Sequence, residues 1–212
     1  MPDAPSSRSV KIGADERTGW SSERPRRDGA PPRPANIAVR SRVLRPSDRM
    51  RYSPGSLLLV VGATDSGPDR FLDRVLEERG IAFSLAKVRA LLAGRVADDE
   101  IESRSRELLD ATVTKRQHGG QTVVIAIEGF DAEERERYVR LAHGLRRPRH
   151  LLLIETARNQ LQEDERPALD ELRRALDAGE LGQEGFQTAM RLGGNALSEL
   201  KRIVFRPPPR ED

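Results

Sequence analysis

The chain has 212 residues, of which 37 are basic and 34 acidic, and it contains no cysteine. The lack of cysteine excludes a disulfide scaffold, a cysteine-ligated zinc or iron–sulfur site and a thiol nucleophile. The longest apolar runs, such as residues 57–61, are far shorter than the roughly 20 residues that cross a bilayer. No secretory signal opens the chain, so we expect a cytoplasmic protein with no membrane contact.

Charge and proline divide the chain unevenly. Residues 1–56 hold 12 basic against 6 acidic residues and 8 of the 14 prolines, whereas the remainder carries a net charge of −3. We expect residues 1–35 to form a disordered basic tail, because proline- and arginine-rich sequence cannot bury enough apolar surface to fold. Residues 36–55 are expected to form a lead-in arm, residues 56–206 the folded domain and residues 207–212 a C-terminal tail. The basic tail predicts either weak, non-specific nucleic-acid contacts or a solubilising linker.

From residue 56 onward, short apolar runs alternate with helical segments. We predict strands at residues 57–61, 81–83, 122–127, 151–154 and 203–205. Helices are predicted from 71 to Gly80, from 88 to Gly94, at 98–118, from Asp131 to just before Pro148, and at 167–178, 184–192 and 196–200. This alternation indicates an α/β fold with a parallel sheet of about five strands and helices on both faces.

A glycine-containing loop joins the first strand to the first helix. Its two glycines are separated by four residues, which is the spacing of a P-loop, whose backbone amides bind phosphate. The spacing predicts a remnant phosphate loop formed by Gly62, Thr64, Ser66 and Gly67.

The two residues after this loop lack the chemistry of a nucleotide site. Pro68 stands where a lysine is normal and removes a cation and an amide donor together. Asp69 stands where a magnesium-ligating hydroxyl is normal, and we expect it and Asp65 to direct negative charge at the phosphate position. Proline suits the first helical position, with Ser66 as the candidate capping residue. The loop is therefore predicted to keep its fold and to lose its nucleotide affinity.

Residues 56–206 resemble the P-loop kinases related to the 5′-hydroxyl kinase domain of polynucleotide kinase, a group that also looks like the zeta-toxin-type kinases. The resemblance rests on order and spacing. Residues 83–94 stand where the family has Ser-Ser-Asp-x-x-Arg, residues 123–130 where it has a strand ending in Asp-x-Thr-Asn, and residues 184–186 follow an arginine-rich lid. It implies a three-layer P-loop NTPase-like fold with a helical lid. It places the family's general base at Ala86, its strand-end aspartate at Ala126 and its lid arginines at Arg158, Arg166, Arg173 and Arg174.

Four principal chemical positions of the family (Pro68, Asp69, Ala86 and Ala126) are thus changed together. We predict a degenerate, pseudokinase-type protein without catalytic residues, cofactor or metal, which binds a protein partner or itself as a scaffolding or regulatory module. The alternative is an ATP- and Mg²⁺-dependent kinase that phosphorylates a nucleic-acid end or a small hydroxyl substrate. This would require Glu128, Asp65 or Asp69 to recruit the metal, and Arg70 or a lid arginine to replace the lysine.

Several other charged residues admit two interpretations. Glu128 is the only candidate carboxylate at the end of the third predicted strand, and it is either a functional group or a solvated one. Lys87 and Arg89 fit a salt-bridged surface helix as well as a substrate site. The arginines of residues 146–149 could grip phosphates, and the three histidines have no metal-ligand spacing.

Overall fold

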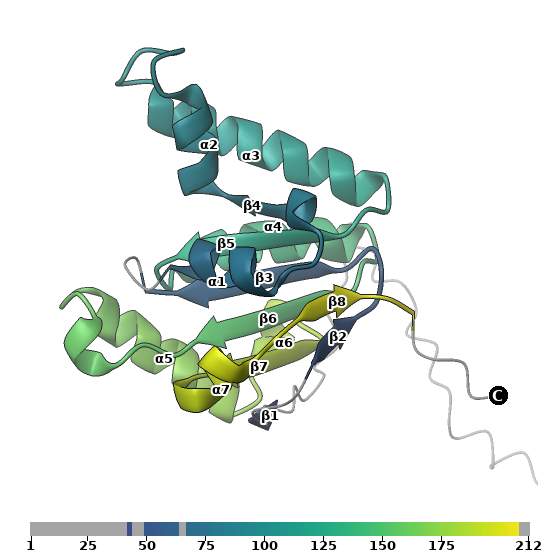
Figure 1. The fold of residues 1–212 in the computed structure, drawn as a ribbon, viewed down its shortest axis with the longest axis vertical. Helices are drawn as coiled ribbons and strands as arrows, with labels where there is room; N and C mark the ends of the chain where they lie inside the picture. The colour runs from purple at the N-terminus through teal and green to yellow at the C-terminus, as the bar shows by residue number, and fades with distance from the viewer. Residues whose placement is uncertain (1–41, 44–48, 64–66, 208–212) are drawn as a thin grey trace, which may run out of the picture. The chain divides into compact units, whose positions relative to one another are not determined.

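The computed structural model describes residues 42–43, 49–63 and 67–207. A parallel sheet with the strand order β1-β7-β6-β3-β5-β4 forms the centre of this part of the chain (Figure 1). Its strands are β1 (Arg42–Val43), β3 (Leu57–Gly62), β4 (Ala82–Ser84), β5 (Val123–Glu128), β6 (Arg149–Ile154) and β7 (Thr188–Leu192). Five of them have at least three residues, so the predicted parallel α/β sheet is confirmed.

Helices cover both faces of the sheet. One face carries α2 (Leu85–Leu92), α3 (Ile101–His118), α4 (Ala132–Gly144), α5 (Glu165–Asp177) and α6 (Leu181–Glu184). The other carries α1 (Pro68–Val75) and α7 (Gly194–Glu199). Two short 3-10 turns, η1 (Arg79–Ile81) and η2 (Arg158–Gln160), lie in the connections. The sheet has one hydrophobic core on each face. Leu57 and Leu59 of β3 pack into the core beneath α2 to α6, and Leu58 packs into the core beneath α1 and α7, because successive strand side chains point to opposite faces.

The prediction of a helix at residues 184–192 is wrong. Helix α6 ends at Glu184, where Gly185 has a φ of 105°, and residues 188–192 form β7. This strand pairs in parallel with β6, from His150 opposite Thr188 to Ile154 opposite Leu192. Backbone pairing along the open edge of β6 outweighs the helical propensity of Ala189, Met190 and Leu192, since local propensity is a weak preference.

The strand predicted at residues 203–205 exists but does not join the main sheet. It is β8 (Ile203–Phe205), which pairs in parallel with β2 (Met50–Tyr52) in a separate two-stranded sheet. Met50 and Ile203 are buried in the same core as α1, so this small sheet covers part of one face. The end of the predicted lead-in arm is therefore part of the packed structure.

The helix predicted to run to Gly80 is shorter. Helix α1 ends at Val75, and Leu76 is extended and forms an isolated parallel bridge with Ile203. The predicted basic tail (1–35) and the final residues 208–212 lie outside the described residues. None of the helices that the structure describes is long and apolar enough to cross a bilayer.

All strands of the main sheet run parallel, so their carboxyl ends lie at one edge. This edge carries the end of β3 at Gly62, the end of β4 at Ser84 and the end of β5 at Glu128. Ligand sites of open α/β sheets form at this edge, and of the residues singled out in the sequence, Gly62, Ala126 and Glu128 lie here.

Candidate functional site

The glycine loop leads directly from β3 into α1. Thr64, Asp65 and Ser66 lie outside the described residues, so the predicted cradle is seen only at its two glycines. Gly67 has a φ of 69° and is the N-cap residue of α1. Pro68 occupies the first turn as predicted, and the N-cap position belongs to Gly67, whereas the predicted cap, Ser66, lies outside the described residues. Glycine suits the cap position because a left-handed backbone strains other residues.

The carboxylate of Asp69 is bonded to the neighbouring strand and helix. Its Oδ2 accepts a hydrogen bond of 2.5 Å from the hydroxyl of Ser84, and its Oδ1 lies 3.0 Å from Nζ of Lys87. Lys87 also forms a 3.0 Å ion pair with Asp73. Asp69 therefore shares its charge with Lys87, whereas the sequence analysis expected its charge to be directed at the phosphate position. Lys87 has the salt-bridged role that was one of its two interpretations.

These contacts shift the pKa of Lys87. Burial by itself lowers the pKa of Lys87, but the hydrogen bonds and charges of Asp69 and Asp73 outweigh burial, and its pKa is raised. Lys87 is therefore a protonated cation at neutral pH. Both of the carboxylates that pair with it belong to α1.

Arg70 brings a second cation to the loop. A Cβ built on Gly67 would lie 2.5 Å from Nε and 3.0 Å from Nη2 of Arg70. The guanidinium therefore packs directly against the second glycine of the loop. A cation of this chain therefore lies beside the loop that lacks its lysine, and one of the sequence hypotheses named this residue.

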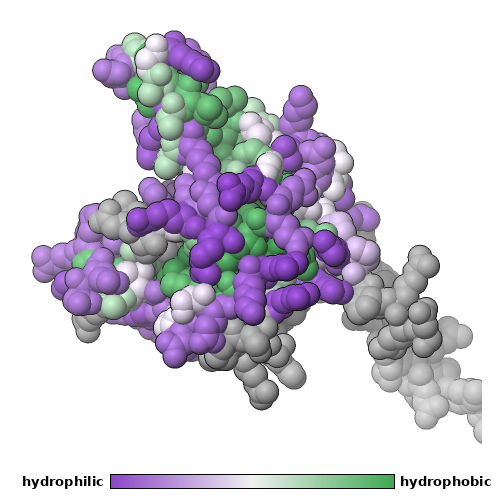
Figure 2. Space-filling model, viewed as in Figure 1, coloured by the Kyte–Doolittle hydropathy of each residue, from purple (hydrophilic) through white to green (hydrophobic). Residues whose placement is uncertain are grey.

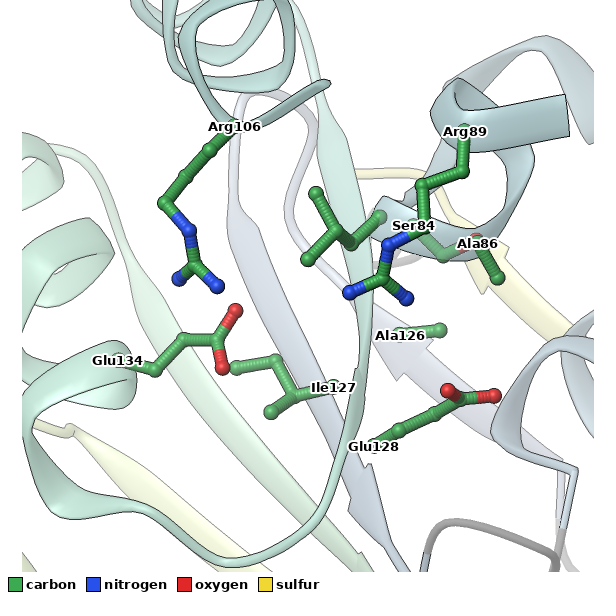
Figure 3. A pocket seen from close by; sticks show the side chains of 9 residues that line it. Ser84, Ala86, Arg89, Arg106, Ala126, Ile127, Glu128 and Glu134 are labelled. Atoms are coloured by element: carbon green, nitrogen blue, oxygen red, sulfur yellow. The ribbon is translucent and has the colours of Figure 1, made fainter. Parts of the chain in front are cut away.

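A pocket of about 240 Å³ lies between α2, α3 and the ends of β4 and β5 (Figure 3). Ala86 and Ala126 both line it, so the two positions that the resemblance assigns to a general base and a strand-end aspartate carry methyl groups at one site. Glu128 also lines the pocket, at the exposed end of β5. The complete lining is Ser84, Leu85, Ala86, Arg89, Arg106, Ala126, Ile127, Glu128 and Glu134.

Two arginines of this pocket are joined by one carboxylate. Glu102 accepts a 2.7 Å hydrogen bond from Nε of Arg89 and a 2.9 Å bond from Nη2 of Arg106. The bond from Arg89, followed by that from Arg106, lowers the pKa of Glu102 to about 2. Sequence reasoning missed Arg106 and Glu102. Their four-residue spacing was a detectable signal, but their approach to Arg89 depends on the packing of α2 against α3.

Glu134 completes the charged lining from the first turn of α4. Burial raises its pKa, and the positive charge of Arg106 only partly opposes this effect. The sequence placed Glu134 correctly in the first turn of a helix capped by Asp131, whose side chain accepts a 3.0 Å hydrogen bond from the amide of Glu133. Nothing in the sequence indicated that Glu134 would reach this pocket.

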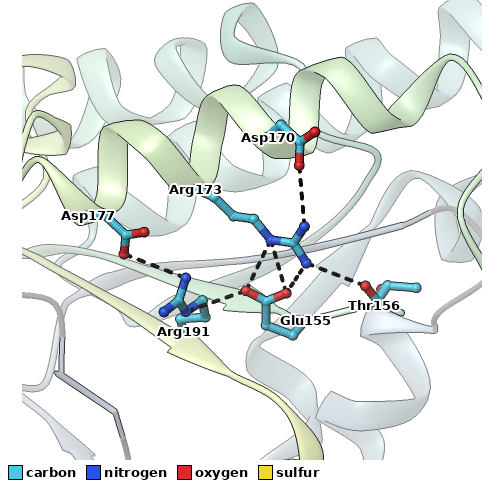
Figure 4. A network of polar contacts seen from close by, with 6 residues as sticks. All are labelled: Glu155, Thr156, Asp170, Arg173, Asp177 and Arg191. Carbon is cyan, nitrogen blue, oxygen red and sulfur yellow. Dashed lines mark hydrogen bonds and ion pairs between the residues drawn. The ribbon is translucent and has the colours of Figure 1, made fainter. Parts of the chain in front are cut away.

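The predicted lid arginines whose side chains the structure describes, Arg166, Arg173 and Arg174, differ in their surroundings. Arg173 donates to both carboxylate oxygens of Glu155 at the end of β6 and lies 3.4 Å from Asp170 (Figure 4). Arg191 of β7 approaches the same carboxylate at 3.4 Å. Arg174 is exposed, and Arg166 is half-buried. The backbone of Arg158 lies in η2, and its side chain is outside the described residues.

Other predicted surface arginines are used inside the structure. Arg149 is 7% exposed, and its Nε donates a 2.6 Å hydrogen bond to the carbonyl oxygen of Gly185. Arg147 donates to the carbonyl oxygen of Gln117 at the end of α3. Arg146 is exposed. The predicted phosphate-binding patch therefore keeps one exposed arginine. Within the described residues no cluster of three histidine or acidic side chains could hold a metal ion.

No protein-family model matches this sequence, and no curated protein matches it. Solved structures are similar in fold. A chain from the PezAT chromosomal toxin–antitoxin system of Streptococcus pneumoniae has a TM-score of 0.50 at 13% identity, over 68% of this chain and 69% of that chain. A kinase candidate from Chloroflexus aurantiacus has a TM-score of 0.43 at 12% identity, over 66% of this chain and 86% of its own. The tunicamycin resistance protein of Deinococcus radiodurans has a TM-score of 0.37 at 14% identity, over 72% of this chain and 99% of its own.

Sequence identities this low are evidence of a similar fold and not of a shared function. The first of these similarities supports what the loop, the parallel sheet and the helix order already indicate: the chain has a P-loop kinase-like fold.

Proposed function

We propose that this chain is a catalytically inactive P-loop kinase-like protein that acts as a binding, scaffolding or regulatory module. The observation that carries the proposal is the junction of the loop with α1. Pro68 supplies neither a charge nor an N–H, and Asp69 supplies a carboxylate that is already bonded to Ser84 and Lys87. A nucleotide–magnesium site needs a lysine and a hydroxyl at these two positions.

The acceptor side of the fold supports the same proposal. Ala86 and Ala126 face the pocket where the resembling kinases have two carboxylates, and a methyl group can neither accept a proton nor organise a metal. Phosphoryl transfer depends on positioning and on neutralising charge, so losing the cation, the hydroxyl and both carboxylates removes most of its catalytic parts.

The lid supports it further. Arg173, the lid arginine that reaches the carboxyl edge of the sheet, is held by Glu155. A phosphate group would have to compete with this carboxylate, whose ion pair is only partly exposed to solvent. The charge of Arg173 is therefore already paired.

One observation favours a second candidate, an ATP- and Mg²⁺-dependent kinase acting on a nucleic-acid end or a small hydroxyl compound. The guanidinium of Arg70 packs against Gly67, so a cation does lie at the loop. In this candidate Arg70 neutralises phosphate, and Glu128 recruits the metal or accepts the proton of the substrate hydroxyl.

Calorimetric titration with ATP and Mg²⁺ separates the two candidates. We expect the native chain to give no saturable binding at millimolar nucleotide, which corresponds to a binding free energy weaker than about −4 kcal/mol. The double variant Pro68→Lys/Asp69→Thr restores the missing cation and hydroxyl, and it should bind at least tenfold more tightly than the native chain.

The matched control for that gain is Pro68→Ala, which restores the amide without the charge. Tight binding by the native chain, together with transfer of labelled γ-phosphate that is lost in Arg70→Ala and in Glu128→Ala, would instead establish the kinase. A partner role is tested separately, by measuring self-association of the full chain in sedimentation experiments and by its salt-dependent binding to nucleic acid.

A further inference from the structure

The pocket between α2 and α3 has opposite charges on its two sides. In Figure 3 the guanidinium of Arg106 lies toward the carboxylate of Glu134, and that of Arg89 lies toward Glu128 across Ala126. The charges of Glu128 and Glu134 both act on Arg89 and contribute to raising its pKa, behind the larger effect of its hydrogen bond to Glu102. Two cations and two carboxylates therefore share one cavity.

A residue outside the cavity holds the two arginine side chains in place. Glu102 does not line the pocket, and it holds Arg89 through Nε and Arg106 through Nη2. No hydrogen bond of the two terminal nitrogens of Arg89, or of the remaining nitrogens of Arg106, is made to a residue that the structure describes, and a ligand can use them. A guanidinium held in this way presents its N–H groups in a fixed fork, which suits a carboxylate or a phosphate.

The glutamate side of the pocket needs a positively charged hydrogen-bond donor. Glu134 is half-buried, and among the side chains that the structure describes none donates a hydrogen bond to it. A carboxylate removed from water without a donor is unfavourable, and an ammonium group would provide both charge and N–H donors. Between the two charged sides the lining is apolar and consists of Ala86, Ala126 and Ile127.

The volume limits the size of the ligand. At roughly 30 Å³ per molecule of liquid water, the 240 Å³ of the pocket hold about eight waters, or an organic molecule of about ten non-hydrogen atoms. A nucleotide is larger than this volume.

We infer that this pocket binds a small zwitterion, in which a short apolar spacer joins an ammonium group to a carboxylate or a phosphate. The anionic end contacts Arg89 and Arg106, and the ammonium end contacts Glu134 and Glu128. The inference rests on the proposed function, because it assigns a ligand to the cleft that a binding module would use.

Calorimetry on the full chain tests it with two zwitterions, 4-aminobutyrate and O-phosphoethanolamine. Each is compared with probes that lack one end: butyrate and butylamine for the first, ethyl phosphate and ethanolamine for the second. We expect at least one zwitterion to saturate and to bind at least tenfold more tightly than both of its one-ended probes. The stronger of the two zwitterions identifies the anionic group as carboxylate or phosphate.

Variants locate the site. Arg106→Gln and Glu134→Gln should each weaken the zwitterion at least tenfold, whereas Arg104→Gln should not, because Arg104 lies on the same helix, pairs with Glu107 and is outside the pocket. If Arg106→Gln does not fold, Arg106→Lys keeps the charge without the fork and should still weaken binding.

Three results would overturn the inference: no saturable binding by either zwitterion, binding of a one-ended anion as tight as that of its zwitterion, or binding that is unchanged in both pocket variants. Each is distinct from failure of the proposed function, which would appear as ATP binding and phosphate transfer whether or not a zwitterion binds.

Discussion

His150 should make the stability of this protein strongly dependent on pH. Its imidazole lies in β6, with its ring centroid 4.6 Å from that of Tyr52, and its Nδ1 is 2.8 Å from the hydroxyl oxygen of Thr188. Its Nε2 is buried, and no partner for it occurs among the described residues. Burial, and to a smaller extent the charge of Arg149, lowers the pKa of His150 from 6.5 to about 4.

A lowered histidine pKa means that the unfolded chain binds a proton more readily than the folded chain. The stabilisation is complete above pH 6.5 and is lost as the pH falls toward 4. For these two pKa values the loss is about 2 kcal/mol at pH 5 and about 3 kcal/mol at pH 4. Such a loss is a large part of the 5–15 kcal/mol that is typical of a domain.

Urea unfolding at pH 7.5, 6, 5 and 4 measures this loss. Carboxylates also titrate toward the acid end, so the decisive quantity is the difference between the native chain and His150→Phe, which keeps a ring beside Tyr52 but cannot be protonated. We expect this variant to lose about 2 kcal/mol less than the native chain between pH 7.5 and pH 5. His118→Gln, at an exposed histidine, is the control and should follow the native chain. Equal pH dependence in the native chain and His150→Phe would refute the reasoning.

Three further substitutions test the packing around the site by chemical denaturation. Arg135 is 3% exposed and bonded to Glu184, so Arg135→Ala should cost about 3–5 kcal/mol by leaving that carboxylate without its partner; a loss below 1 kcal/mol would contradict this. Gly67→Ala should cost about 1–2 kcal/mol, because its backbone is left-handed and a Cβ would meet Arg70; an unchanged midpoint would argue against this geometry. Ser84→Ala should cost about 1–2 kcal/mol, since Ser84 caps α2 and donates to Asp69, whereas exposed Ser103→Ala should be nearly neutral.

The Asp69–Lys87 pair shows how the loop can stay folded without a ligand. In a P-loop the first turn of the helix meets phosphate, and positive amide ends face negative charge. Here Asp69 lies in that first turn, where a carboxylate is favoured by the helix dipole, and Ser84 and Lys87 hold it in place. The acid therefore contributes to the structure of a site that we propose has lost its nucleotide.

Residue identity alone decided several properties of this protein. Pro68 cannot supply a charge or an amide in any fold, and Ala86 and Ala126 cannot act as acids or bases. The buried strands β3, β5 and β6 were predictable because continuous apolar runs leave no solvent-facing side. The start of α4 at Asp131 was predictable because capping is a local interaction between near neighbours.

Tertiary structure decided what depends on partners distant in sequence. Residues 188–192 form a strand because β6 offers them an open edge, and residues 203–205 leave the main sheet because β2 pairs with them. Asp69 is neutralised by Lys87, and Arg89 meets Arg106 through Glu102, only because α2 packs beside both α1 and α3. Such contacts follow from the path of the backbone, and neither residue type nor local spacing specifies that path.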